Sequence, residues 1–221
     1  YGNGLIILGD SHAMNLYNLT YSHSKENFIF GLSNGGCRAH DDGGCHYFKF
    51  REFLKNQKLS KNSEFDISLF KIIYVQSGSY LFLDPQKKLK NRGLFRAEKV
   101  REYDLDYNDI NKLEKYIISI SDYADVIWFG SRIEPSIDPK KILRNGCRKN
   151  ITIKKNIEKN FINLDNFIKK ISLNKNYKYI SQINAINFND KNDLFTCSEI
   201  FWRDGDHFSV SGMKHFAPRI L

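Results

Sequence analysis

Five short apolar runs, separated by longer segments, constrain the fold of this 221-residue chain more than any other feature. Each run has the length and composition of a buried strand, whereas segments such as Ile110–Ile120 carry apolar residues at helical spacing. Parallel strands need a helix-length connection, so this alternation predicts a three-layer α/β/α sandwich around a central, about five-stranded parallel sheet. The predicted strands are Leu5–Leu8, Asn27–Leu32, Ile72–Val75, Val126–Phe129 and Tyr177–Ile183.

One domain, residues 1–221, is the expected organisation. No apolar run approaches the roughly 20 residues of a membrane-spanning helix, and the N-terminus lacks the pattern of a signal peptide. The chain opens on Tyr1 rather than Met and ends inside the predicted helix Phe216–Leu221, which indicates a domain excised from a longer protein. The stretch Leu81–Tyr107 has little periodicity, and we expect a long surface excursion there, placed where it could cover an active site. The other predicted helices are Ser11–Leu19, Tyr47–Leu54, Ile110–Ile120 and Glu158–Ile171.

Four cysteines are spaced in a way that fits no zinc-binding pattern, so we expect no metal site. An even count favours disulfides, for which three pairings are open. Cys37 and Cys45 flank a turn rich in Gly and Asp, so the pairing we expect is Cys37–Cys45 with Cys147–Cys197. Disulfides form in an oxidising compartment such as the periplasm or the cell surface, and four buried thiols in a cytosolic protein are the alternative.

The net charge of +9 bears on possible partners. Lysines are scattered among Asn and Ile, which favours a solvated basic surface, and contact with an anionic membrane or an acidic glycan is the alternative. No pattern of aromatic residues among basic ones indicates nucleic-acid recognition, so we expect no nucleic-acid partner.

Ser11 stands where the first predicted strand passes into the first predicted helix. In parallel α/β sheets, ligands bind beyond the carboxyl ends of the strands, where helix N-termini present backbone N–H groups. A hydroxyl at this position lies in the positive potential of the helix start, which favours an alkoxide and a neighbouring oxyanion. Serine also caps many helices, so a plain capping role is the alternative.

A second polar group lies near the other end of the chain. Asp204 and His207 are three residues apart, just before the final predicted helix. A serine hydroxyl needs a base to take its proton, and an imidazole base needs a carboxylate to hold its tautomer. If the last loop folds back beside the first, then Ser11, His207 and Asp204 form a catalytic triad, with Asp206 as the alternative carboxylate.

Together these motifs resemble the SGNH hydrolase superfamily, also called GDSL-like. The resemblance rests on Gly-Asp-Ser-His-Ala at residues 9–13 and on Asp204-x-x-His207 near the end. With Gly36-Cys37 and the late Cys197, the chain more narrowly resembles the periplasmic SGNH domain fused to acyltransferase-3 membrane proteins. Those proteins O-acetylate bacterial surface carbohydrate such as the O-antigen of lipopolysaccharide. The resemblance implies that Ser11 is the nucleophile, His207 the general base and later the general acid, and Asp204 the orienting carboxylate.

The resemblance also implies an oxyanion hole with three donors. In the family these are the N–H of the nucleophile, a glycine N–H after the second strand and an asparagine side chain after the third. Here Ser11 supplies the first, and Gly36, or failing it Gly35, supplies the second. The family's asparagine block is absent after the third predicted strand, so Ser77 is expected to take its place. The alternatives for this third donor are Ser79 and Gln76.

The activity implied by the resemblance is O-acyl transfer onto a hydroxyl of surface glycan. An acyl group, expected to be acetyl, would reach Ser11 as an acyl-enzyme, and a sugar hydroxyl activated by His207 would accept it. No cofactor is expected in this domain, because a membrane-embedded acyltransferase-3 domain of the same polypeptide would supply an acyl group derived from acetyl-CoA. We therefore expect a monomeric periplasmic domain tethered to the inner membrane, with glycan as its acceptor. The alternatives are a carbohydrate O-acetyl esterase and a non-catalytic module that binds glycan.

Overall fold

A five-stranded parallel sheet forms the centre of the molecule, as the sequence predicts. The computed structural model describes residues 3–23, 26, 28–41, 45–59, 66–84, 93–145 and 151–221. In these residues the sheet has the order β2-β1-β3-β6-β7, and each neighbouring pair is parallel. From β1 the chain passes to the edge strand β2 on one side and then to β3 on the other side of β1. The direction of strand order therefore reverses at β1, and ligand sites in parallel sheets lie at the carboxyl end of such a strand. The strands are β1 (Gly4–Gly9), β2 (Phe28–Ser33), β3 (Phe70–Val75), β6 (Asp125–Phe129) and β7 (Lys178–Ile180).

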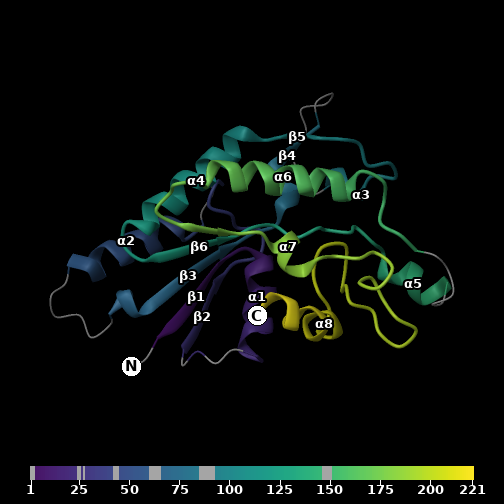
Figure 1. Cartoon of the computed structure of the whole chain (residues 1–221), viewed down its shortest axis with the longest axis horizontal. Helices are drawn as coiled ribbons and strands as arrows, with labels where there is room; N and C mark the ends of the chain where they lie inside the picture. The colour runs from purple at the N-terminus through teal and green to yellow at the C-terminus, as the bar shows by residue number, and fades with distance from the viewer. Residues whose placement is uncertain are drawn as a thin grey trace.

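Helices cover both faces of this sheet and complete the three layers. In Figure 1, α2, α4 and α6 lie on one side of the strands, and α1 and α8 lie on the other. The apolar stripe of α4, which includes Ile110, Leu113 and Ile117, is fully buried, as expected for a helix with one face on a sheet. The five helices are α1 (Ser11–Tyr21), α2 (Tyr47–Leu59), α4 (Tyr107–Ser121), α6 (Ile157–Ile171) and α8 (Val210–Ile220).

The buried side chains form a main core and two smaller clusters. The main core lies under α2, α4 and α6 and includes Ile72 and Trp128. A second cluster, around Trp202 and Phe216, lies near the C-terminus and packs α7 (Gln182–Ile186) and α8 onto the loop between them. The third cluster lies between β1 and α1 and includes Ile7. The C-terminal segment thus has an apolar core of its own beside the carboxyl end of β1.

Two expectations from the sequence are wrong. The predicted strand Tyr177–Ile183 ends at Ile180, because Ser181 accepts a hydrogen bond from the Asn184 N–H and begins the short helix α7 (Gln182–Ile186). In its described residues, 81–84 and 93–107, the stretch Leu81–Tyr107 is not a surface excursion, since Phe82 and Phe95 are buried in the main core. Short elements in this stretch and its surroundings are η1 (Ile67–Leu69), η2 (Gly78–Leu81), the antiparallel pair β4 (Phe82–Leu83) and β5 (Asp104–Leu105), α3 (Gly93–Arg96) and α5 (Pro139–Asn145).

The predicted bridge between Cys37 and Cys45 is confirmed. It pins the chain just after β2, where the Cys37 carbonyl also accepts a hydrogen bond from the Tyr47 hydroxyl at 2.8 Å. Cys197 is disulfide-bonded as well. Its expected partner, Cys147, lies outside the described residues, so that pairing stays a prediction. Within the described part of the chain, no helix combines the length and the apolar character needed to cross a membrane.

Candidate active site

The two ends of the chain meet at the carboxyl end of β1. The Ser11 Oγ lies 2.7 Å from the His207 Nε2, although the two residues are 196 positions apart in the sequence. Ser11 is partly exposed, whereas His207 is buried. A hydroxyl that reagents can reach is therefore hydrogen-bonded to an imidazole shielded from water.

The local sequence explains why Ser11 presents its hydroxyl rather than capping the helix. Asp10 is the N-cap of α1, and its Oδ1 accepts the His12 N–H at 2.9 Å. Gly9 has a φ of +150°, and a Cβ on it would lie 1.8 Å from the Val75 carbonyl oxygen. Only glycine allows β1 to turn this closely against β3. The capping role weighed for Ser11 thus belongs to Asp10, and the Ser11 side chain is left to contact His207.

Asp204 holds the other nitrogen of the His207 ring. The His207 Nδ1 lies 2.9 Å from the Asp204 Oδ1 and 3.0 Å from its Oδ2. The same Oδ1 accepts the backbone N–H groups of His207 at 2.9 Å and of Asp206 at 3.1 Å. The loop therefore wraps around this carboxylate. With the Nδ1 proton donated to Asp204, the Nε2 lone pair is free to accept the Ser11 hydroxyl proton.

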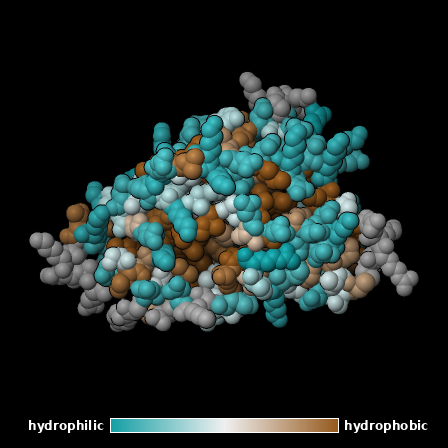
Figure 2. Space-filling view, viewed as in Figure 1, coloured by the Kyte–Doolittle hydropathy of each residue, from teal (hydrophilic) through white to brown (hydrophobic). Residues whose placement is uncertain are grey.

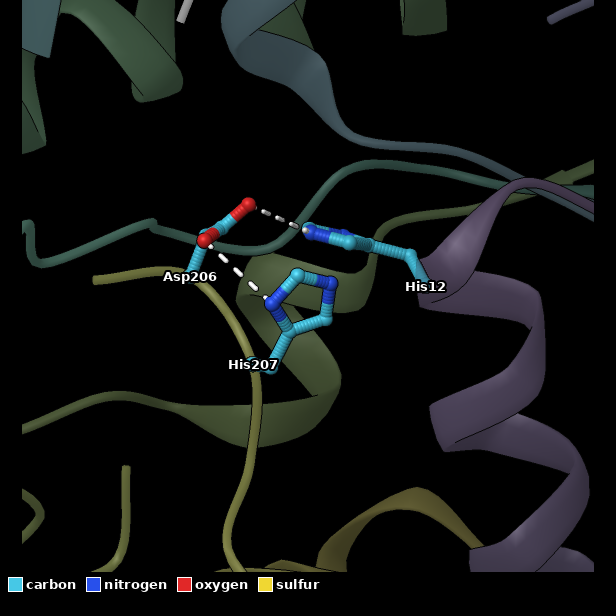
Figure 3. A group of neighbouring side chains, drawn as sticks. All are labelled: His12, Asp206 and His207. Atoms are coloured by element: carbon cyan, nitrogen blue, oxygen red, sulfur yellow. Dashed lines mark ion pairs between the residues drawn. The ribbon is translucent and has the colours of Figure 1, made fainter. Parts of the chain in front are cut away.

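Asp206 lies beside two imidazole rings, as Figure 3 shows. Its Oδ1 is 3.3 Å from the His207 Nδ1, and its Oδ2 is 3.6 Å from the His12 Nε2. His12 projects from α1 and is fully buried, and its ring meets that of His207 edge-on at a centroid distance of 5.4 Å. The base thus has two neighbouring carboxylates, of which Asp204 forms the shorter contact with Nδ1.

The two carboxylates set the proton affinity of the base. Burial by itself lowers the pKa of His207, but the hydrogen bonds and negative charges of Asp204 and Asp206 outweigh burial and raise this pKa to about 9. In return, burial raises the pKa of each carboxyl, and the histidine contacts outweigh it, so both pKa values lie below their ordinary value. At neutral pH the arrangement favours an imidazolium between two carboxylates.

A buried glutamate behind the site was missed by the sequence reasoning. The Glu134 Oε1 accepts the Ser77 hydroxyl at 2.7 Å and the Gly78 N–H at 2.8 Å, and it lies 4.0 Å from the His12 Nε2. Burial raises the pKa of Glu134, although the neighbouring His12 opposes this shift. Glu134 thereby fixes the loop after β3 to the loop after β6. One feature of the sequence could have indicated Glu134: it lies shortly after the carboxyl end of a predicted strand, and binding sites in parallel sheets lie at those ends.

Arg132 and Asn15 join the first helix to the last loop. The Arg132 Nη2 donates to the Asn15 Oδ1 at 2.9 Å and to the Asp206 carbonyl at 2.8 Å. The Asn15 Oδ1 also accepts the Phe208 N–H at 3.0 Å. Burial lowers the pKa of Arg132 to about 10, against the pull of the surrounding carboxylates. These bonds hold the residues on either side of His207 against α1.

The predicted oxyanion donors lie on the loops after β2 and β3. Gly36 is exposed, with a φ of +81°, at the turn before the Cys37–Cys45 bridge. Ser77 already has acceptors for both of its donor groups, because its N–H donates to the Asp10 Oδ2 at 3.1 Å and its hydroxyl to Glu134. An oxyanion role for Ser77 requires one of these bonds to open. The roles of Gly36 and Ser77 therefore stay predictions.

Three side chains of the site could also offer ligand atoms to a metal ion. One ligand atom from each of His12, Asp206 and His207 lies within 4.8 Å of the others. The buried Arg132 guanidinium beside Asp206 opposes a dication at this point. The negative charges of Asp204 and Asp206 are already offset by the His207 imidazolium. The geometry therefore fits acid–base chemistry better than metal ligation.

Comparison with known proteins places this geometry in context. The model of the family described as "SGNH domain (fused to AT3 domains)" matches residues 1–221. A search of curated proteins finds none that matches. Two solved structures are similar to the chain. The periplasmic domain of a lipopolysaccharide acetyltransferase from Salmonella ser. Paratyphi A is 14% identical, with a TM-score of 0.61, over 100% of this chain and 82% of that one. A member of the lipolytic protein G-D-S-L family from Veillonella parvula DSM 2008 is 12% identical, with a TM-score of 0.50, over 99% of this chain and 96% of that one.

Proposed function

Since the chain belongs to the family of SGNH domains fused to AT3, or acyltransferase-3, domains, we propose that it is a serine-dependent O-acyltransferase that acts on bacterial surface glycan. The observation that carries this proposal is the hydrogen-bonded series from Ser11 through His207 to Asp204. A nucleophile, a base and an orienting carboxylate in this order are what acyl transfer through serine requires.

In the first step, the Ser11 Oγ attacks the carbonyl carbon of the acyl donor while its proton moves to the His207 Nε2. Asp204 stabilises the imidazolium through Nδ1. The developing oxyanion is stabilised by the Ser11 N–H at the start of α1, and we propose the Gly36 N–H as a second donor. The intermediate then collapses, the donor's leaving group takes the proton from His207, and an acyl ester remains on Ser11.

In the second step, a sugar hydroxyl attacks the ester on Ser11. His207, neutral again, takes the proton of that hydroxyl at Nε2 and returns it to the Ser11 Oγ as the ester bond breaks. The products are the O-acylated sugar and the free serine. Water in place of the sugar hydroxyl gives hydrolysis by the same route, which is the esterase alternative, and the similarity to a lipolytic protein favours testing it.

The partners and location follow from the same family relationship. We propose that the domain works in the periplasm, tethered to the inner membrane through an acyltransferase-3 domain of the same polypeptide. The description of the family and the similar periplasmic domain of an acetyltransferase support this assignment. The membrane domain would deliver an acetyl group derived from acetyl-CoA, so the proposed chemistry needs no cofactor and no metal within this chain.

The test measures acyl transfer directly. The chain is incubated with 4-nitrophenyl acetate, with and without a sugar acceptor, and the products are analysed by mass spectrometry. We expect acetylation of Ser11 in the wild type, acetylated sugar when the acceptor is present, and neither product in Ser11→Ala with an unchanged circular dichroism spectrum. Acetate without acetylated sugar would identify an esterase. Glycan binding without acetylation of Ser11 would identify a binding module.

A further inference from the structure

A hollow on the Asp204 side of the triad is a candidate binding site that the acyl-transfer scheme does not use. Its volume is about 660 Å³, and its walls come from α5, the loop before α5, the segment leading into α6 and the loop that carries Asp204. Asp204 and Gly205 form part of its lining. Asp204 contacts His207, which contacts Ser11, so the hollow begins one imidazole ring away from the nucleophile.

The charged lining of this hollow, which we call the basic groove, is mainly cationic. In Figure 2, hydrophilic side chains cover much of the end of the molecule where Figure 1 places α3 and α5. Of the two carboxylates in the lining, Asp138 accepts the Lys140 N–H at 3.0 Å, and Asp204 is bonded to His207 and lies 3.5 Å from the Arg203 guanidinium, so five cations face two carboxylates. The cationic residues are Arg96, Lys140, Lys141, Lys154 and Arg203.

Lys154 is a fixed positive centre in this groove. Its ammonium group donates to the carbonyls of Phe95 at 3.2 Å, Arg96 at 3.3 Å and Ala97 at 2.9 Å. Burial and then the positive charge of Lys141 lower the pKa of Lys154. The three N–H donors of Lys154 are therefore occupied, and its positive charge stays fixed at the wall of the groove, where it attracts an anion through space.

A second hollow, lined by residues of β1, β2 and the start of α2, differs in chemistry. Its volume is about 410 Å³, and Leu8, Leu32, Tyr47 and Phe50 are among its lining residues. Lys49 is the lysine in that lining. A sugar with a charged group has little to contact there, whereas the basic groove offers several cations beside the triad.

We propose that the basic groove binds the acceptor glycan and selects acceptors that carry an anionic group, a carboxylate or a phosphate, near the hydroxyl that is acylated. This inference rests on the proposed acyltransferase function and adds the charge of its substrate. Cations that converge on one groove lower the free energy of a bound anion and speed its arrival, and both effects weaken as salt screens them.

The first experiment measures binding, which does not depend on turnover. Methyl glucuronide supplies a carboxylate, glucose 6-phosphate supplies a phosphate, and methyl glucoside is the neutral match. Each sugar is titrated into the isotopically labelled chain, and the amide shifts are followed by nuclear magnetic resonance. We expect saturable shifts at residues 136–138, 140–141 and 203–205 for one or both anionic sugars, and weaker binding as salt increases. The sugar that binds more tightly identifies the anionic group.

The second experiment uses charge variants. Lys140→Gln with Lys141→Gln removes two exposed cations that touch no member of the triad. The matched control, Lys169→Gln with Lys170→Gln, removes two exposed cations near the end of α6, about 20 Å along that helix from its start. We expect the groove variant to raise the Kd and the acceptor KM of the anionic sugar by about tenfold, with the control unchanged. Release of 4-nitrophenol without acceptor should be the same in all three proteins.

Two outcomes overturn the inference and leave the proposed function standing. In one, acetylation of Ser11 proceeds but neutral and anionic sugars bind and react equally well. In the other, the groove variant and the control variant weaken anionic sugars to the same extent, which would indicate net charge alone. Absence of acetylation at Ser11 together with preferential binding of anionic sugars would instead contradict the proposed function and leave the groove assigned as a glycan-binding site.

Discussion

The two carboxylates beside His207 contact it differently, and this difference assigns their roles. Asp204 reaches the Nδ1 at 2.9 Å and is fixed by two backbone N–H groups, whereas Asp206 stands at 3.3 Å and also faces His12. We expect Asp204→Asn to lower kcat by about 10³- to 10⁴-fold, because the amide disturbs the tautomer of the base. Asp206→Asn should keep the base oriented and lower kcat by less than about tenfold.

The pH dependence of these variants provides the second readout. Ser11 can transfer its proton only to neutral His207, so acylation should rise as pH increases through the His207 pKa of about 9. Asp206→Asn removes one of the charges that raise this pKa, so the midpoint should move to lower pH. The measurement is kcat/KM for 4-nitrophenyl acetate as a function of pH. A wild-type midpoint at the ordinary histidine value of 6.5, or a larger loss of kcat in Asp206→Asn than in Asp204→Asn, would contradict the assignment.

The sequence predicts the residues that gather around Ser11 but not those behind them. Ser11, Asp204 and His207 lie in motifs that place them at strand-to-helix loops, and the structure brings all three together. Glu134 and Arg132 lie in an irregular segment with no motif, and their importance comes from burial between loops that are distant in sequence. A pattern along the chain cannot report which charged side chains tertiary packing removes from water.

At the scale of elements, Asp193 fastens α8 to the loop that follows α7. The Asp193 side chain is fully buried and accepts two bonds from Arg219, at 2.8 and 2.9 Å, and one from the His215 Nε2 at 2.7 Å. The Asn189 N–H adds a fourth at 2.7 Å. Because His207 lies just before α8, this clamp also supports the candidate active site.

Replacing Asp193 should therefore destabilise the fold. We expect Asp193→Asn to lower the free energy of unfolding by about 2 to 3 kcal/mol, because buried donors lose a charged acceptor. Burial raises the pKa of Asp193, but Arg219 and His215 outweigh it and hold the pKa below its ordinary value of 3.8. The stabilisation is therefore present above that pH and lost as pH falls through the depressed pKa. Urea unfolding at several pH values measures it. Asp190→Asn, in the same loop but outside this clamp, is the control, and equal destabilisation in both variants would exclude a specific clamp.

The elements that the sequence predicts best are those whose apolar pattern matches their environment. The central strands β1, β3 and β6 each contain an apolar run, residues 5–8, 72–75 and 126–129, because helices cover both faces of the sheet. The edge strand β7 is shorter than the predicted strand Tyr177–Ile183, because Ile183 belongs to α7 and the Ser181 cap that separates the two elements does not interrupt the spacing of apolar residues enough to mark a boundary. The buried stretch around Phe82 and Phe95 was missed because it is irregular and its contacts are tertiary.

At the scale of the whole molecule, the candidate active site forms only when both ends of the chain are folded. Ser11 belongs to the start of the sheet, and His207 adjoins the second core cluster around Trp202. The main core, which contains Trp128, and this second cluster share the flanking side chains Ile153 and Phe188. Arg132, in the loop after β6, also bonds to the Asp206 carbonyl. Because of these shared contacts, we expect the two cores to unfold as one cooperative unit.

Urea unfolding tests this cooperativity because the two tryptophans lie in different cores. Trp202→Phe leaves fluorescence from Trp128 in the main core, and Trp128→Phe leaves fluorescence from Trp202 in the second cluster. We expect each variant's fluorescence midpoint to coincide with the midpoint of its own loss of acyl transfer, because separation of α8 from the sheet would expose Arg132 and break the contact between Ser11 and His207. If Trp202 fluorescence and activity changed at lower urea than the Trp128 signal, the C-terminal cluster would be an independently unfolding unit, and the site would depend on the weaker of two cores.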